Sequence, residues 1–170
     1  GFLRTGSRDL CDYLELPGRD FRSGPDAAVL ASPAARAVRS ARQVILESVK
    51  HNQGFLDIVN DAKSRVQQTD IAGYQAMTAQ GKPHILIDVR EDNEWAAGRA
   101  AGAIHIGKGI IERDIETKVP DKAQTLVLYC GGGFRSALAG EALQKMGYRS
   151  VISLDGGWKA WKEAGLPIEC

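Results

Sequence analysis

The chain has 170 residues, 44% of them hydrophobic and 25% charged, which fits one globular domain with a buried core and an appendage. Its 22 basic and 21 acidic side chains give a net charge of +1, and this balance argues against a dedicated nucleic-acid surface. No apolar stretch approaches the length of a membrane span, so we expect neither a nucleic acid nor a membrane as partner.

The residues ahead of the main domain fall into two predicted segments. Residues 1–32 carry scattered glycines and prolines, which favours an irregular arm or a leader derived from a vector or a fusion. Residues 33–67 are predicted as a helical extension, because Ser32 can cap a helix and Pro33 suits its first position. An apolar stripe follows at helical spacing, formed by Ala34, Val38, Ala41, Ile45 and Val49.

That stripe predicts a contact surface, because an isolated helix of this length is marginal in water. The stripe either packs on the outside of its own domain or meets a copy on another chain, and we favour a homodimer through the N-terminal helices. A second helix is expected after the break at 52–54. Its inward side chains are predicted to be Phe55, Ile58 or Val59, Ala62 and Val66.

Residues 68–170 alternate strand-like and helix-like segments, which predicts an α/β domain. Continuous apolar runs, typical of parallel strands covered on both faces, occur at 85–89, 125–129 and 151–154. Weaker strands are expected near Ile71 and at 103–106. Helices are predicted at 73–80, 91–97, 109–117, 136–146 and 158–164. Gly147 is expected to end the fourth of these helices as a C-terminal cap.

Cysteine usage points to one reactive thiol. Cys11, Cys130 and Cys170 are odd in number and far apart, so we expect neither a disulfide framework nor a metal site, and we expect a reducing, cytoplasmic location. Cys11 lies in the arm and Cys170 is terminal, so neither is assigned a catalytic role.

The segment from Cys130 to Ser136, Cys-Gly-Gly-Gly-Phe-Arg-Ser, is the most informative about chemistry. It follows a predicted buried strand and opens a helix, at the edge of an open α/β sheet where ligands bind. Three successive glycines let backbone amides point at one centre, and the helix start adds its positive end. A thiol at Cys130 should therefore lose its proton easily, and Arg135 adds a positive charge beside an anionic substrate. The alternative is a cysteine buried for packing, followed by a glycine-rich helix cap.

Three separated blocks of this sequence together resemble the rhodanese family of sulfurtransferases, over about residues 69–169. The first block is Leu86-Ile87-Asp88-Val89-Arg90-Glu91, with Glu94-Trp95 and Gly102-Ala103-Ile104-His105-Ile106. The second is Cys130 to Ser136, and the third is Gly147-Tyr148 with Val151, Leu154, Gly156-Gly157-Trp158, Trp161, Gly165 and Pro167. The resemblance implies a five-stranded parallel sheet flanked by helices, with Cys130 as the sulfur-carrying nucleophile. It also implies a substrate cradle made of Gly131, Gly132, Gly133, Phe134, Arg135 and Ser136.

The sequence departs from the family pattern in two places. The turn at 98–103 reads Gly-Arg-Ala-Ala-Gly-Ala where the family usually has Gly-His-Ile-Pro-Gly-Ala, which affects stability or loop position more than chemistry. The loop also has no basic residue directly after Cys130, and Arg135 is its single charge. Tight binding of free thiosulfate is therefore less assured than in relatives with a more basic loop.

The remaining polar and aromatic residues of these blocks are interpreted mainly as scaffold. Asp88 is expected to support the site by capping the next helix, with orientation of Arg135 or the loop amides as the alternative. Arg90 and Glu94 have the i, i+4 spacing of a local ion pair. His105 is expected to be a satisfied interior residue rather than a general base. Trp158 and Trp161 are expected to pack on the sheet, with substrate stacking as the alternative.

The resemblance implies a two-step transfer in which Cys130 takes the outer sulfur of a donor such as thiosulfate and hands it to a thiol or cyanide. No metal or organic cofactor is implied. One alternative is a phosphatase or arsenate reductase on the same fold, but such relatives hold a longer loop than the four residues between Cys130 and Arg135. The other is a non-catalytic binding module, and such modules commonly lose the cysteine.

Overall fold

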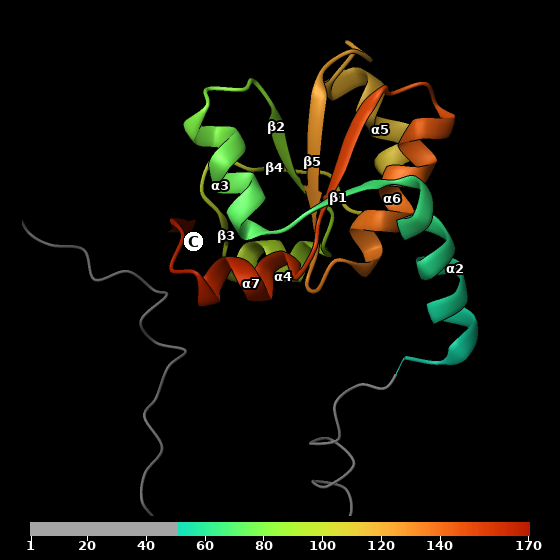
Figure 1. The fold of residues 1–170 in the computed structure, drawn as a ribbon, viewed down its shortest axis with the longest axis horizontal. Helices are drawn as coiled ribbons and strands as arrows, with labels where there is room; N and C mark the ends of the chain where they lie inside the picture. The colour runs from blue at the N-terminus through green and yellow to red at the C-terminus, as the bar shows by residue number, and fades with distance from the viewer. Residues whose placement is uncertain (1–50) are drawn as a thin grey trace, which may run out of the picture.

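The computed structural model describes residues 51–170, and the predicted arm and the helix at 33–50 lie outside the described residues. A parallel five-stranded sheet with the order β1-β6-β5-β2-β4 lies at the centre of the fold (Figure 1). Its strands are β1 (Gln67–Thr69), β2 (Ile85–Asp88), β4 (Ile104–His105), β5 (Thr125–Tyr129) and β6 (Ser150–Leu154). The predicted α/β class and five-stranded parallel sheet are confirmed.

Helices cover both faces of the sheet (Figure 1). They are α2 (Gln53–Arg65), α3 (Ile71–Ala79), α4 (Asp92–Ala97), α5 (Ile111–Lys118), α6 (Phe134–Lys145) and α7 (Gly157–Glu163). One core cluster joins α5 and α6 to the sheet, and a second joins α3 and α7 to the opposite face. Helix α2 packs against α6 on the outside of the first face. A short antiparallel pair, β3 (Arg99–Ala100) and β7 (Ile168–Glu169), ties the 98–103 turn to the C-terminus.

Side chains of the central strands alternate between the two faces of the sheet. Because both faces are covered by helices, these strands are apolar at nearly every position. In β5, Leu126 and Leu128 enter one cluster, whereas Val127 and Tyr129 enter the other. All four residues are buried, as expected for a strand covered on both faces. The order of the strands then brings the ends of β2, β5 and β6 to one edge of the sheet.

The strand expected near Ile71 is present as the edge strand β1, which ends at Thr69 and is formed by polar residues. Ile71 itself begins α3, because the Asp70 carboxylate accepts the Gly73 amide at 2.8 Å and caps that helix. In α2, Val59 is buried and Ile58 is 55% exposed, so Val59 is the inward residue of the two that the sequence left open.

Gly147 ends α6 as expected. Its φ is +96°, in the left-handed region that favours glycine, and its amide donates to the Gln144 carbonyl at 2.9 Å. The following amide of Tyr148 donates to the Leu143 carbonyl at 3.1 Å, which completes the helix end.

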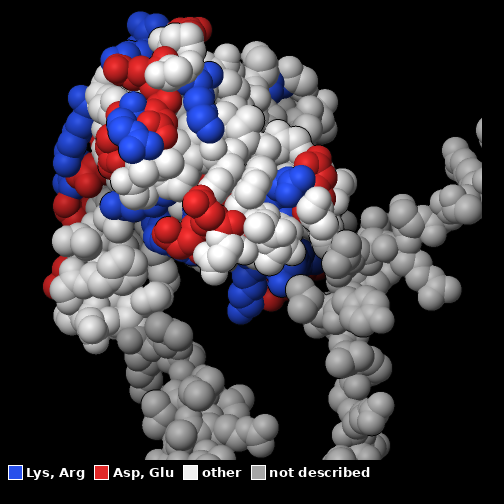
Figure 2. Space-filling view, turned by 180° about the vertical axis from the view of Figure 1, so that it is seen from behind, with Lys and Arg blue, Asp and Glu red and all other residues white. Residues whose placement is uncertain are grey.

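Charged side chains of both signs are interspersed over the face shown in Figure 2, in keeping with the balanced composition. Within residues 51–170, no helix combines the length and the apolar character that crossing a membrane requires.

Candidate active site

Cys130 directly follows β5 and lies at the carboxyl edge of the sheet. The residue is 1% exposed, and it is the free cysteine among the described residues. The Gly133 amide donates to the Cys130 Sγ at 3.2 Å. Gly133 has a φ of +92° and is the N-cap of the twelve-residue helix α6, so the sulfur lies beside the positive end of that helix. Gly133 can adopt this positive φ because it has no Cβ, and the positive φ lets its N–H point at the Cys130 sulfur.

Two buried hydroxyl groups lie behind the sulfur. The Ser136 Oγ is 3.7 Å from the Cys130 Sγ and 2.8 Å from the Ser153 Oγ. Both serines are 0% exposed, so their hydroxyls pair with each other away from bulk water, and the Ser136 hydroxyl also lies beside the sulfur. Ser136 belongs to the predicted loop, whereas Ser153 lies in β6 and was missed because it follows no motif.

The start of α7 fixes the backbone of the loop. The Trp158 amide donates to the Cys130 carbonyl at 2.6 Å, and the Lys159 amide donates to the Gly131 carbonyl at 3.2 Å. This close approach requires a glycine at position 157, where φ is +48° and a Cβ would lie 2.2 Å from the Cys130 carbonyl oxygen. The loop carbonyls are therefore bound by α7, while the Gly133 N–H remains directed at the sulfur.

Arg135, the single charge of the loop, binds carboxylates of α4 and its N-cap. Its Nη1 lies 2.7 Å from Glu94 Oε2, and its Nη2 lies 3.0 Å from Glu94 Oε1. Glu91 Oε1 is a third, longer contact at 3.4 Å. The hydrogen bond with Glu94 raises the pKa of Arg135 and lowers the pKa of Glu94. Arg135 is therefore already paired with a carboxylate.

Asp88 and Arg90 form a buried ion pair beneath the site, with Arg90 Nη2 2.6 Å from Asp88 Oδ2. The Arg90 amide also donates to Asp88 Oδ1, and Nη2 donates to the Gly98 carbonyl at 2.7 Å. The guanidinium lies 4.6 Å from the Trp158 ring centroid. Burial opposes the charge of Arg90, but hydrogen bonds and charge from Asp88 raise its pKa overall.

These contacts correct two predictions about the first sequence block, which contains Asp88, Arg90 and Glu94. The predicted Arg90–Glu94 pair is wrong, because Arg90 pairs with Asp88 and Glu94 pairs with Arg135. Asp88 does not cap the next helix, since the N-cap of α4 is Glu91, which forms a capping box with Glu94. Asp88 instead supports the site through Arg90 and the Trp158 ring above it.

Helix α2 and the residues just before it pack against Phe134 of the cysteine loop. This contact was not predicted from the sequence. The Phe134 ring contacts the rings of His51 and Phe55, with centroids 4.9 and 6.1 Å apart. Lys63 Nζ lies 5.2 Å from the Phe134 ring centroid and 2.7 Å from Asp155 Oδ1, at the end of β6. The described part of the helical extension therefore contacts Phe134 of the cysteine loop. The sequence gives no signal for this contact, because the two segments lie far apart along the chain.

The other histidine and tryptophan residues behave as scaffold. His105 Nε2 lies 3.0 Å from the Arg90 carbonyl oxygen, and its ring stacks on Trp95. Trp158 and Trp161 pack against the sheet in the second core cluster, and the Trp161 Nε1 donates to the Pro167 carbonyl. The expected structural roles of these residues agree with their contacts.

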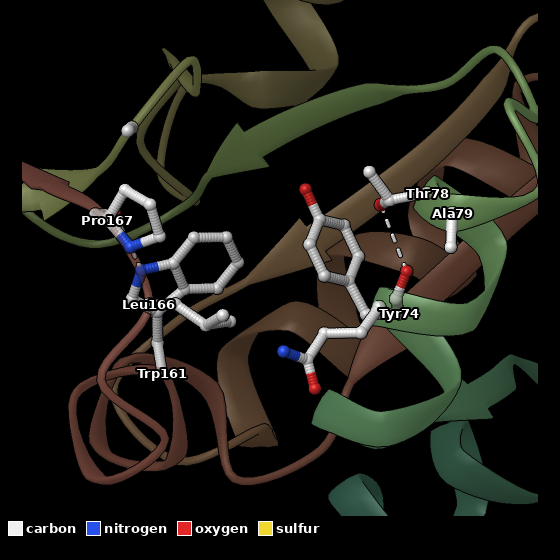
Figure 3. Close-up of a pocket in the computed structure, with 8 residues that line it drawn as sticks. Tyr74, Thr78, Ala79, Trp161, Leu166 and Pro167 are labelled. Atoms are coloured by element: carbon white, nitrogen blue, oxygen red, sulfur yellow. Dashed lines mark hydrogen bonds between the residues drawn. The ribbon is translucent and has the colours of Figure 1, made fainter.

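A cleft of about 430 Å³ lies between α3 and the C-terminal segment, away from the loop residues of the candidate site. In Figure 3, Tyr74 and Trp161 flank this hollow, with Leu166 and Pro167 beside the tryptophan. None of the residues from Cys130 to Ser136 lines it.

No group of three or more histidine, cysteine, aspartate or glutamate side chains within residues 51–170 is arranged to hold a metal ion.

A free cysteine at the head of a glycine-rich turn, between a central parallel strand and the start of a helix, is an arrangement suited to cysteine-dependent group transfer. Residues 71–164, more than half of the chain, match the rhodanese-like domain family. The chain belongs to this family, as the three sequence blocks predicted. Helix α2 and strand β1 precede the matched region.

Among its relatives, the chain is 33% identical over 100 residues to the thiosulfate sulfurtransferase GlpE of Vibrio cholerae, covering 59% of this chain and 92% of that protein. It is 40% identical over 82 residues to YtwF of Bacillus subtilis, a protein named as a candidate sulfurtransferase, covering 48% and 77% of the two chains. A solved structure from Rhodopseudomonas palustris, described as a possible tyrosine phosphatase, is 28% identical with a TM-score of 0.60, covering 72% and 98%. The family and its sulfurtransferase relatives support an enzyme of the sulfurtransferase type.

Proposed function

We propose that this protein is a sulfurtransferase that carries sulfane sulfur as a persulfide on Cys130. The observation that carries the proposal is the Cys130 sulfur itself, which is free, receives the Gly133 N–H at 3.2 Å and lies beside the start of α6. A hydrogen-bond donor and a helix N-terminus favour an anionic sulfur, both in the thiolate and in the persulfide that follows it. The thiosulfate sulfurtransferase among the relatives supports the same chemistry.

The reaction has two steps. In the first, the Cys130 thiolate attacks the outer sulfur of thiosulfate, the bond between the two sulfur atoms breaks, and sulfite leaves with the electron pair. In the second, cyanide or a thiolate attacks the terminal sulfur of the persulfide and leaves as thiocyanate or as a new persulfide, which restores the Cys130 thiolate. Neither step needs an external oxidant or an obligatory general base.

The phosphatase or arsenate reductase alternative fits the loop less well. Four residues separate Cys130 from Arg135, and a tetrahedral oxyanion needs a wider ring of donors than one sulfur atom does. The Arg135 guanidinium, which would bind such an oxyanion, is bound to Glu94. A non-catalytic binding module is disfavoured because Cys130 stands in a complete loop.

The test is mass spectrometry of the purified protein after treatment with thiosulfate. We expect one added sulfur on a peptide that contains Cys130, removed again by cyanide with release of thiocyanate. The Cys130→Ser variant should fold normally but gain no sulfur, because a hydroxyl group forms no persulfide. Hydrolysis of p-nitrophenyl phosphate by wild-type protein without sulfur uptake would favour the phosphatase alternative, and absence of both reactions would favour the binding module.

We further propose that the protein acts in the cytoplasm. We also propose that two copies of the chain form a homodimer through their N-terminal helices. Residues 33–50, which carry the apolar stripe, lie outside the described part of the chain.

A further inference from the structure

The ion pair between Arg135 and Glu94 determines how much positive charge the cysteine loop can offer to a donor. The pair is bidentate, with distances of 2.7 and 3.0 Å. Glu94 is also held in place from its own side, because its Oε2 accepts the Glu91 amide at 3.1 Å within the capping box of α4. The carboxylate is therefore preorganised to receive the guanidinium and loses little side-chain freedom in doing so.

Two other cations near the loop, Arg90 and Lys63, are paired as well. Arg90, above which the Trp158 ring lies, is bound to the buried carboxylate of Asp88. Lys63, above the Phe134 ring, is 2.7 Å from Asp155. Each of these cations has a carboxylate partner, and Glu91 adds a further negative charge 3.4 Å from Arg135. These ion pairs thus leave Arg135, Arg90 and Lys63 with little uncompensated positive charge for an anion.

Donors of sulfane sulfur differ in charge. Thiosulfate carries two negative charges, so it must either displace Glu94 from Arg135 or enter next to that carboxylate, and both routes cost electrostatic free energy. An alkyl persulfide carries at most one negative charge on its sulfur atoms, and its organic half needs no cation. A site whose guanidinium is already neutralised should favour the second kind of donor.

We propose that Glu94 is a specificity-determining residue that biases Cys130 toward alkyl persulfides and against thiosulfate. In this reaction the Cys130 thiolate attacks the terminal sulfur of R–S–SH, the bond between the two sulfur atoms of the donor breaks, and R–S⁻ leaves. The product is Cys130–S–SH, so atoms, charge and oxidation level balance. The inference rests on the proposed function, because it concerns the donor for the same cysteine.

The experiment compares kcat/KM for thiosulfate with kcat/KM for 2-hydroxyethyl persulfide, whose organic half is uncharged, using cyanide as acceptor, in wild-type protein and in Glu94→Gln. Glutamine keeps the size of the side chain and its oxygen can still accept the Glu91 amide, so the capping box is preserved. Because Arg135 lowers the pKa of Glu94, the wild-type carboxylate is fully ionised at neutral pH, and the variant removes one whole charge.

We expect the thiosulfate-to-persulfide ratio of kcat/KM to rise about tenfold or more in Glu94→Gln, because a charge-assisted contact to Arg135 becomes available to the donor. Glu112→Gln is the matched control: it removes the same charge from the exposed side of α5, and its ratio should stay within about twofold of wild type. A residue that only stabilised the loop would lower both activities together.

The outcomes separate the two ideas. An unchanged or lower ratio in Glu94→Gln, with Cys130 still taking up sulfur from either donor, would overturn this inference and leave the proposed function intact. An equal rise in Glu112→Gln would also overturn it, because the effect would then come from overall charge. Wild-type protein that takes sulfur from neither donor would overturn the proposed function and, with it, the role of Glu94.

Discussion

Replacing Arg90 by methionine should destabilise the protein more than the loss of one surface charge would. The substitution keeps much of the side-chain volume but leaves the Asp88 carboxylate, which is 0% exposed, without its cation. It also removes the donor to the Gly98 carbonyl and the cation above the Trp158 ring. Breaking a buried ion pair by removing one partner costs about 3–5 kcal/mol. That is a large part of a total stability of about 5–15 kcal/mol.

Urea unfolding followed by tryptophan fluorescence measures this loss. With a slope of about 2 kcal/mol per molar urea, the midpoint of Arg90→Met should fall by roughly 1.5–2.5 M.

The double variant Asp88→Asn, Arg90→Met is the control. It removes both charges, so it should recover at least about half of the lost stability, since a buried pair contributes little net free energy once its desolvation is counted. A midpoint shift below about 0.5 M in Arg90→Met, or a double variant less stable than the single one, would refute the electrostatic reasoning.

Three further predictions concern the loop and the chain assembly. Arg135→Ala should raise the apparent KM for thiosulfate roughly ten- to a hundredfold in steady-state kinetics, because it leaves the Glu94 carboxylate beside the loop without its cation, and unchanged kinetics would show that neither charge reaches the donor. Gly157→Ala should lower both the melting temperature and the activity, since its Cβ would lie 2.2 Å from the Cys130 carbonyl oxygen. Gly132→Ala should have little effect on the melting temperature, since nothing lies within 4 Å of its added Cβ, and an equal loss of melting temperature in both variants would contradict the steric argument. Deletion of residues 1–50 should lower the mass measured by light scattering from dimer to monomer, whereas a monomer before and after would rule out the dimer.

The central strands and the cysteine loop could be predicted from the sequence because their signals are local. A run such as 125–129 is apolar at nearly every position, and the glycines after Cys130 have few other uses between a strand and a helix. The position of Cys130 at the sheet edge follows from the strand that precedes it. These features need no knowledge of the distant parts of the chain.

The charge pairing could not be predicted in the same way. Glu94 has an arginine four residues before it, which favours a local pair, yet its partner Arg135 lies 41 residues further on. Arg90 turns back to Asp88 because a carboxylate buried at the end of β2 would otherwise lack a cation. Burial decides this competition, and burial depends on how α4 and α6 pack in three dimensions.

The hydrogen bonds from α7 to the Cys130 and Gly131 carbonyls couple the shape of the loop to the start of that helix, so changes in the two segments depend on each other. A loop transplanted from a relative into this scaffold would need a compatible Gly157, some 27 positions further along the chain, to keep its shape. Insertions that lengthen the loop would be accommodated best at Gly132, which is exposed and has open space around it. Directed evolution of this site should therefore vary the two segments together rather than one at a time.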